Sequence, residues 1–270
     1  IRDGKKGTPI PFWKVYKLTV SGFALNYATP VGLMGGEPYR IMELTPYVGA
    51  SKATSSVILY VMMHIFSHFC FWFFSIFLYL ALRPVDIAMG TILAVVGAVS
   101  LLAIYFFMKG YKNGMAVRTL KLLQHIPFIK EWAKRFSENK REALERVDSQ
   151  IAELHKQRRS TFYASLSLEF MARIIGCLEV YFILNILTTD VSFPACILIM
   201  AFTSLFANLF FFSPMQLGAR EGGFALAVGG LAIPGAFGVY TGLITRVREL
   251  IWIVIGVLLM KVGNGTPANK

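Results

Sequence analysis

The chain has 270 residues, of which 56% are hydrophobic and 16% are charged. Because soluble domains carry roughly 25% charged residues, this composition excludes an ordinary soluble domain and indicates an integral membrane protein. The net charge of +12 is typical either of nucleic-acid binding or of loops beside anionic lipid, and we expect anionic lipid and no nucleic acid, because about half of the Lys and Arg lie in one segment, residues 109–160.

The first predicted element is a short apolar run, Phe12 to Pro30, which follows a basic N-terminal segment. The chain begins with Ile1 and not with Met, so we expect transmembrane spans to precede it in a longer protein. The run leads into TPVGLMGGEPYR, Thr29 to Arg40, whose prolines and glycines favour a turn. Irregular backbone at membrane depth is tolerated only where it is buried in protein or lines a cavity.

Three longer apolar segments meet the length rule for a spanning helix, which needs about 20 mostly apolar residues. Ala53 to Leu82 contains no Asp, Glu, Lys or Arg, and Ile87 to Met108 follows it after a short turn. Thr161 to Leu187 is less pure because it holds three charged residues. The sequence therefore predicts two spans before the basic segment and one after it.

The basic segment, residues 110–160, is predicted to be a cytoplasmic amphipathic linker. Its first part mixes Lys and Arg with Leu, Phe and Trp132, which is typical of a segment at the membrane interface. Its second part has Leu144, Val147, Ile151 and Leu154 at helical spacing below a highly charged face. We expect a solvated helix here, with a regulatory or partner-binding role as the alternative.

The C-terminal third is apolar but interrupted. Val191 to Ala219 is broken by Pro214, and Gly222 to Thr245 is rich in Gly and contains Pro234. Val239 to Met260 is long enough to span a membrane, although it carries three charged residues. These interruptions predict a second turn at membrane depth.

The two turns share one sequence skeleton, [ST]-P-x-x-L-x-x-x-E. Thr29, Pro30, Leu33 and Glu37 in the first match Ser213, Pro214, Leu217 and Glu221 in SPMQLGARE. The repeated skeleton predicts that both turns have the same role.

Charge counts predict the topology. If the basic linker is cytoplasmic, residues 12–40 begin and end on that side and must form a re-entrant hairpin. Residues 191–237 begin and end on the other side and form a second hairpin of opposite orientation. We therefore predict an all-α polytopic helical bundle, a single transmembrane domain over 1–270 that is built as an inverted repeat, with repeats at 12–109 and 161–261. Such repeats place substrate sites near the midplane, at broken helices.

The turns supply the candidate substrate-binding residues. Charged side chains at membrane depth cost roughly 2.5 to 3.5 kcal/mol on insertion scales, so they face the protein interior and pair. The pairs Glu37–Arg40 and Arg220–Glu221 either lock the hairpins in place or line a cavity for a headgroup, since arginine fits phosphate and a carboxylate fits an ammonium group. The candidate set is Asn26, Pro30, Gly35, Gly36, Glu37, Arg40, Asn208, Pro214, Gly218, Arg220, Glu221 and Arg246. We expect Asn26 and Asn208 to bind backbone groups that the prolines free.

No cofactor site is predicted. His64 and His68 share a helix face, but no third metal ligand is evident. Glu169 and Arg173 form a favourable i, i+4 pair that we expect to be structural. The sequence has no dinucleotide fingerprint and no convincing Ser/His/Asp set, and its three isolated cysteines favour neither a disulfide scaffold nor a zinc site.

The two turn motifs, the basic middle segment and the Arg-bearing last helix resemble the lysylphosphatidylglycerol synthase transmembrane-region family, also described as the flippase-like domain. The resemblance covers about Lys14 to Met260. The matching positions are Asn26, Pro30, Gly35, Gly36, Glu37, Arg40, Pro214, Gly218, Glu221 and Arg246.

The resemblance implies a polytopic membrane protein, in known members with re-entrant helices, that moves lipids between leaflets. In the synthase members this region flips the aminoacylated phospholipid that a separate soluble domain makes. The 270 residues hold no such domain, so aminoacyl transfer is not implied. Many members have a Glu-Arg pair early in the span after the first motif, whereas this chain has ILYVMMHIFSHF with His64, which leaves the substrate class open.

The leading hypothesis is therefore a flippase for a phospholipid or lipid-linked headgroup in a bacterial or archaeal cytoplasmic membrane, not an enzyme. Glu37 and Glu221 would face the cationic part of a headgroup, and Arg40, Arg220 and Arg246 would hold its phosphate. The alternatives are a small-solute or ion-coupled transporter and an intramembrane lipid-modifying enzyme, for which the sequence offers no clear nucleophile or metal. The oligomeric state stays open, a homo-oligomer included.

Overall fold

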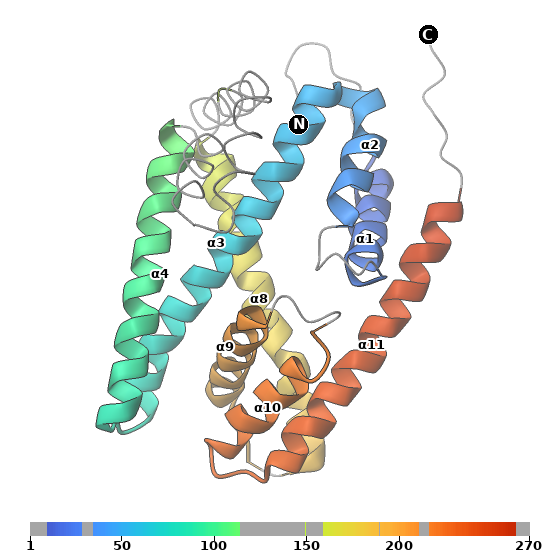
Figure 1. Ribbon diagram of the computed structural model, residues 1–270. Helices are drawn as coiled ribbons and strands as arrows, with labels where there is room; N and C mark the ends of the chain where they lie inside the picture. Colours follow the sequence, from blue (N-terminus) through green and yellow to red (C-terminus); the bar gives the residue numbers. More distant parts are fainter. Residues whose placement is uncertain are drawn as a thin grey trace, which may run out of the picture.

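A computed structural model describes residues 10–28, 35–113, 149, 159–188, 190–210 and 216–262. Within these ranges the chain forms eight helices and no strands, so the predicted all-α fold is confirmed (Figure 1). In chain order they are α1 (Phe12–Ala28), α2 (Gly36–Val48), α3 (Ala50–Leu82), α4 (Ile87–Asn113), α8 (Arg159–Leu187), α9 (Phe193–Leu209), α10 (Ala219–Gly229) and α11 (Gly235–Lys261).

Three helices are long and apolar enough to cross a membrane. They contain the segments Ala50–Leu82, Ile87–Lys109 and Phe162–Leu187, which agree with the three spans that the sequence predicts. Most of the predicted linker, namely residues 114–148 and 150–158, lies outside the described residues.

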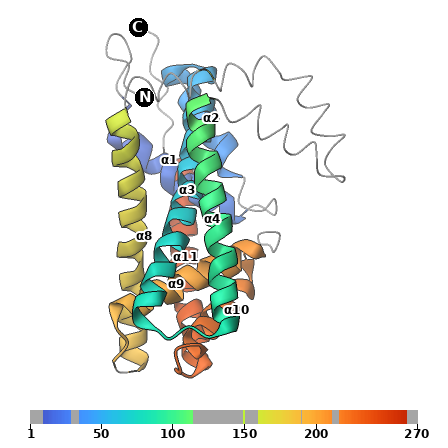
Figure 2. The ribbon, with the colours of Figure 1, turned by 90° about the vertical axis from the view of Figure 1, so that its left-hand side faces the viewer.

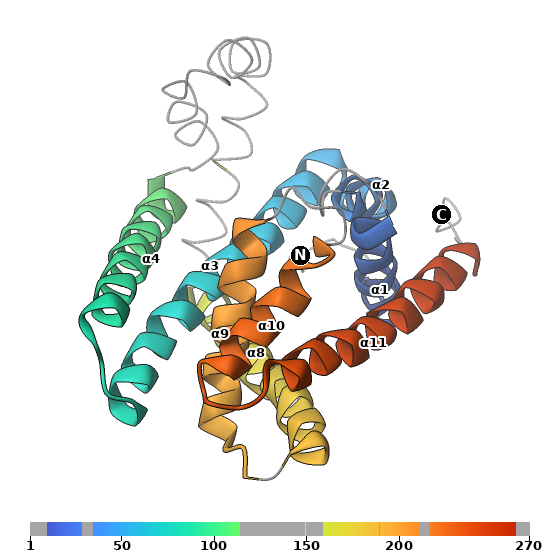
Figure 3. The same cartoon turned by 60° about the horizontal axis from the view of Figure 1, so that its bottom comes forward.

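The helix α3 is the centre of the bundle, because it packs against α2, α4, α8 and α9. The helix α11 packs against α1, α8 and α10, and it lies on the flank of the molecule opposite α4 (Figures 1 and 3). Many apolar side chains of these two flanking helices are exposed, among them Val95 and Leu102 on α4 and Val247 and Val254 on α11. Exposed apolar faces of this extent are typical of a surface covered by lipid.

Two pairs of shorter helices lie at opposite ends of the long helices (Figures 1 and 2). The helices α1 and α2 run antiparallel, since Asn26 contacts Gly36 while Lys14 contacts Glu43. The helices α9 and α10 also pack on each other, with Thr203 beside Gly223 and Gln216 bonded to Ala207. We call α1 with α2 the first hairpin and α9 with α10 the second hairpin.

The apolar run predicted over Gly222 to Thr245 is divided between two helices. Chain direction changes after Gly229, where α10 ends, and Pro234 then caps α11. Proline is favoured at a helix start because its missing N–H has no helical partner there. This boundary gives α11 its full length, so that Arg246 and Glu249 lie near its middle.

Candidate functional site

The Glu37 side chain closes the first hairpin. Asn26 accepts a hydrogen bond from the Gly36 N–H at 2.7 Å and donates through Nδ2 to Glu37 Oε1 at 3.1 Å. Arg40 donates from Nη1 to the same oxygen at 3.4 Å. Asn26 thus satisfies one of the N–H groups that a helix start leaves without a partner, and the expected contact of Glu37 with Arg40 is present.

The Arg40 side chain is buried and joins three helices. It donates to the carbonyl oxygens of Leu18 at 3.3 Å and Thr19 at 3.4 Å on α1. Its guanidinium also lies 4.9 Å from the centre of the Tyr60 ring on α3, a cation–π contact. It crosses α1 at Gly22, where a Cβ atom would overlap the guanidinium. The hairpin itself therefore occupies most of the donors of Arg40.

One oxygen of Glu37 differs from the rest of this network. Glu37 Oε2 is buried, and no hydrogen-bond partner lies near it in the part of the chain that the structure describes. An ionised oxygen without a partner is costly to bury. The position therefore suits a ligand group or a proton.

The second hairpin holds its glutamate differently. Gly218 has φ +79°, a conformation that glycine adopts without strain, and its N–H donates to Glu221 Oε2 at 2.9 Å. Glu221 Oε1 accepts from Arg246 on α11, at 2.9 Å from Nη2 and 3.3 Å from Nε. Both oxygens of Glu221 are therefore occupied.

A chain of alternating charges continues from this contact. Arg246 Nη1 donates to Glu249 Oε2 at 3.4 Å, and Glu249 Oε1 binds Arg220 of α10. Glu249 is only 3% exposed. Next to this cluster, Arg248 binds Glu179 of α8 at 3.0 Å and lies 4.0 Å from Glu249 Oε1. The four charges of Glu221, Arg246, Glu249 and Arg220 balance one another, which lowers the cost of burying them.

The helices α1 and α11 bring the two hairpins close together. Ser21 on α1 donates to the Gly256 carbonyl on α11 at 3.0 Å, and a Cβ at Gly256 would lie 2.6 Å from the Cβ of Ala24. Further along α1, Tyr27 lies within electrostatic range of Arg220 and Glu249. The end of α1 that carries Asn26 thus approaches the charges of the second hairpin.

The predicted site residues separate into three groups. The structure joins Asn26, Gly36, Glu37 and Arg40 in the first hairpin, with Gly35 directly before α2, and Gly218, Arg220, Glu221 and Arg246 around the second. Asn208 instead donates to the Ser204 carbonyl of its own helix at 2.7 Å, because its side chain can reach the preceding turn. Pro30 and Pro214 lie outside the described residues.

Two pairings differ from the expectation. Arg220 binds Glu249 and not the adjacent Glu221, because neighbouring residues point to different sides of a helix. The sequence analysis missed Glu249 as a site residue, although its i, i+3 spacing from Arg246 is a signal for a pair.

The second difference concerns α3 and α8. Glu169 binds His64 at 3.4 Å, while Arg173 donates to Ser67 Oγ and the His64 carbonyl, at 2.8 and 2.9 Å. The expected Glu169–Arg173 ion pair is therefore absent from the described contacts, because α3 provides a ring nitrogen of His64 for Glu169 and two acceptor oxygens for Arg173. Among the described residues no group of three His, Cys, Asp or Glu side chains is placed to hold a metal ion.

The family model described as "Lysylphosphatidylglycerol synthase TM region" matches residues 4–256. The chain belongs to this family. The match includes both hairpins and, together with the three apolar helices, makes the chain an integral membrane protein of a lipid-related family. No curated protein and no solved structure matches the chain.

Proposed function

We propose that the protein is a lipid flippase that moves a phospholipid or a lipid-linked headgroup between the leaflets. In this proposal the two hairpins are re-entrant elements of an inverted repeat and enter the membrane from opposite faces. Their ends meet at a polar site near the midplane, the arrangement by which many transporters alternate access. Membership of a lipid-related family supports the proposal.

The single observation that carries the proposal is the buried, unpartnered Oε2 of Glu37, as far as the described residues extend. Both oxygens of Glu221 and of Glu249 have partners, so among these three described glutamates only Glu37 has a carboxylate oxygen without a partner. Ionisable groups inside a membrane are costly and commonly mark a substrate pathway. Glu37 Oε2 accepts the cationic part of a headgroup in this proposal.

The arginines have unequal roles in this proposal. Arg40 is committed to the carbonyl oxygens of α1, so it fixes the hairpin that carries Glu37. Arg220 and Arg246, which both contact Glu249, hold the phosphate through their N–H donors, while Glu221 positions Arg246. The acyl tails stay in lipid, and transport is facilitated or ion-coupled.

Three further parts of the proposal concern the membrane surface, the chemistry and the oligomeric state. The basic linker binds anionic lipid at the cytoplasmic surface of a bacterial or archaeal membrane. The protein performs transport and no covalent chemistry. It works as a monomer or as a homo-oligomer.

A leaflet-accessibility assay in proteoliposomes tests the function. Fluorescent phospholipids with several headgroups are reconstituted with the chain, and a membrane-impermeant reductant destroys the fluorophores of the outer leaflet. We expect the wild-type chain to expose nearly all fluorophores and Glu37→Gln to leave the inner-leaflet fraction protected. Glu43→Gln is the matched control, because Glu43 lies on the same helix but binds Lys14 at 2.5 Å, away from the hairpin end.

Each other result counts against a part of the proposal. If Glu37→Gln exchanges lipid like the wild type, the charges of the first hairpin are structural and do not contact the headgroup. If the well-folded wild type exchanges no lipid of any headgroup, the flippase is excluded. Release of a trapped charged solute in the same vesicles would then support the small-solute transporter.

A further inference from the structure

A second polar cluster lies between α3 and α8, away from both hairpins. Arg173 of α8 donates to Ser67 Oγ at 2.8 Å and to the His64 carbonyl at 2.9 Å, and its Nη1 lies 3.1 Å from His68 Nδ1. These residues are near the middle of their helices, in segments apolar enough to cross a membrane. The cluster therefore lies deep in the apolar region, where a charge needs a specific reason to be present.

The positive charge of Arg173 is not neutralised by direct contact. The nearest carboxylate on its own helix, Glu169, is directed to His64 at 3.4 Å, and no carboxylate oxygen of the described residues lies within 4.0 Å of the guanidinium. Arg173 donates to the Ser67 hydroxyl, the His64 carbonyl oxygen and the His68 Nδ1 atom, none of which carries a negative charge. A guanidinium has five N–H donors, so Arg173 retains the capacity to bind an anion.

The cluster is accessible from one side. The His64 side chain is half exposed, and Glu169 is partly exposed. The bond from Arg173 Nη2 to the His64 carbonyl also lies in an exposed environment. In a chain embedded in a membrane, the molecules that reach such a surface are lipids and the few waters that accompany them.

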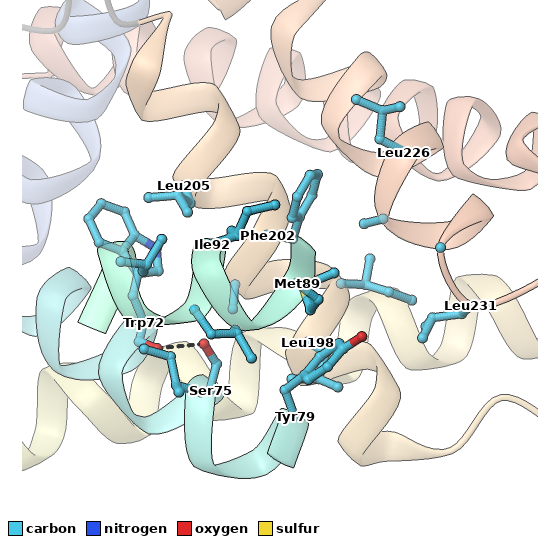
Figure 4. Close-up of a pocket in the computed structure, with 17 residues that line it drawn as sticks. Trp72, Ser75, Tyr79, Met89, Ile92, Leu198, Phe202, Leu205, Leu226 and Leu231 are labelled. Atoms are coloured by element: carbon cyan, nitrogen blue, oxygen red, sulfur yellow. Dashed lines mark hydrogen bonds between the residues drawn. The ribbon is translucent and has the colours of Figure 1, made fainter. Parts of the chain in front are cut away.

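An apolar cavity begins one helical turn further along α3. The His68 ring packs at 5.5 Å from the ring of Trp72, and Trp72 lines a cavity of about 340 Å³ between α3, α4, α9 and α10 (Figure 4). Tyr79, Ile92, Phe202 and Leu226 line it as well. Ligand sites commonly have volumes of about 300 to 1,000 Å³.

The cavity opens toward the surroundings of the bundle, because Ile92, Phe202 and Leu226 are each more than 40% exposed. The Trp72 indole, which packs on His68, also donates to Ser204 at 2.9 Å and is thereby held in place at the side of the cavity next to the polar cluster. A free inorganic anion would fill only the polar end. A molecule with an anionic group and an apolar tail fits both parts.

We propose that Arg173 and the adjoining cavity form a binding site for one anionic phospholipid, with the phosphate at Arg173 and an acyl chain between α3, α4, α9 and α10. This inference rests on the proposed function for the choice of a lipid as ligand, and it adds to the site at Glu37 a second site that is selective for an anionic lipid. Arginine is suited to the phosphate because its planar donors match two phosphate oxygens. The His64 carbonyl oxygen and the His68 ring keep the guanidinium edge in place.

Quenching of Trp72 fluorescence tests the site without any transport step. Trp13, Trp132 and Trp252 are replaced by Phe, so that Trp72 is the remaining fluorophore among the 4 tryptophans. The chain is reconstituted in phosphatidylcholine that contains small fractions of lipid with brominated acyl chains, either phosphatidylglycerol or phosphatidylcholine. We expect brominated phosphatidylglycerol to quench at about tenfold lower mole fraction, the effect of one charge-assisted contact.

Arg173→Gln should remove this preference, whereas Arg248→Gln should retain it. Arg248 is the matched control because it is a half-exposed arginine of another apolar helix, bound to Glu179. Arg173→Lys keeps the charge and should keep most of the preference, so the proposal can be tested even if Arg173→Gln does not fold. Ala227→Leu, which narrows the cavity, should weaken quenching by both brominated lipids.

Three results would overturn the site. They are equal quenching by the two lipids, a preference that survives in folded Arg173→Gln, and displacement of brominated phosphatidylglycerol by excess inorganic phosphate, which would indicate an anion site without a tail. The experiment is independent of lipid exchange. Loss of exchange with intact quenching contradicts only the flippase, and loss of the quenching preference with intact exchange contradicts only this site.

Discussion

The two hairpins share a sequence skeleton but hold their glutamates by different contacts. In the first, Glu37 is bound by Asn26 and Arg40, which belong to the same two helices. In the second, Glu221 caps Gly218 and then depends on Arg246 of α11 for its positive partner. The first hairpin is therefore electrostatically self-contained, whereas the second is completed by a helix that begins after it.

This difference has a consequence for the free carboxylate oxygen. In the second hairpin the backbone N–H of Gly218 donates to Glu221 Oε2. In the first hairpin the backbone N–H of Gly36 donates to the Asn26 side chain instead of to Glu37. The asparagine thereby leaves Glu37 Oε2 without a partner among the described residues. Two turns of similar sequence thus hold their glutamates differently, and in the proposed function only the first of them binds the headgroup through its glutamate.

The largest loss of stability is expected when the contact of the second hairpin with α11 is broken. Glu249→Gln leaves Arg220 and Arg246 facing each other without their shared carboxylate. Breaking a buried ion pair costs about 3 to 5 kcal/mol, and we expect a loss of this order in the free energy of unfolding. Circular dichroism during thermal unfolding in detergent measures it.

Two further variants sharpen this comparison. Glu43→Gln removes a carboxylate from the first hairpin, where Lys14 is its partner, and should cost less because that pair lies near the end of the bundle. The double variant Arg220→Gln with Glu249→Gln should recover part of the loss, as coupled residues do. Equal costs for Glu249→Gln and Glu43→Gln would contradict the dependence on α11.

The next largest loss of stability is expected where the two helices of a hairpin lie closest to each other. A Cβ at Gly36 would overlap the Gly22 carbonyl, and both overlapping groups are backbone. Gly36→Ala should therefore separate α1 from α2 and destabilise the chain by about 1 to 3 kcal/mol. Gly222→Ala is the matched control, since its Cβ would meet only Phe206 at 3.9 Å. A folded Gly36→Ala chain with unchanged unfolding temperature would show that the approach is not required.

Much of this fold could be predicted from the sequence, for identifiable physical reasons. The three spans follow from length and apolar composition, which decide whether a helix is stable in lipid. The contact of Glu37 with Arg40 follows from helical spacing. The family match confirms the resemblance that the turn motifs carry.

Other contacts depend on tertiary packing that local spacing does not encode. The Glu169–Arg173 pair has ideal spacing, yet α3 supplies Ser67 and His64 as better-placed partners. Asn26 lies four residues before Pro30 and Asn208 six residues before Pro214, and the two side chains bind different groups. Spacing along one helix predicts which residues share a face, and it does not predict which neighbouring helix that face meets.

A smaller effect distinguishes the two asparagines. Asn26 forms two hydrogen bonds across the first hairpin, while Asn208 has one within its own helix. Side-chain hydrogen bonds in membrane proteins average about 0.6 kcal/mol, so Asn26→Ala should lower stability by about 1 kcal/mol and Asn208→Ala by much less. Because Asn26 also orients Glu37, Asn26→Ala should slow lipid exchange more than Asn208→Ala. Equal effects of the two variants on both unfolding and exchange would remove the distinction between the hairpins.

The smallest changes in stability should differ in sign between the two hairpins. On α9, Thr203 is buried and its hydroxyl has no partner in the described part of the chain, whereas Ser21 on α1 binds the Gly256 carbonyl at 3.0 Å. Thr203→Val replaces the hydroxyl with a methyl group of similar size and should raise stability by up to about 1 kcal/mol, since burying an unpaired polar group is costly. Ser21→Ala should lower it by about 0.6 kcal/mol. Paired unfolding curves in one detergent resolve the sign, and a destabilised Thr203→Val chain would show that the hydroxyl binds a ligand or water, which would make the second hairpin a binding element as well.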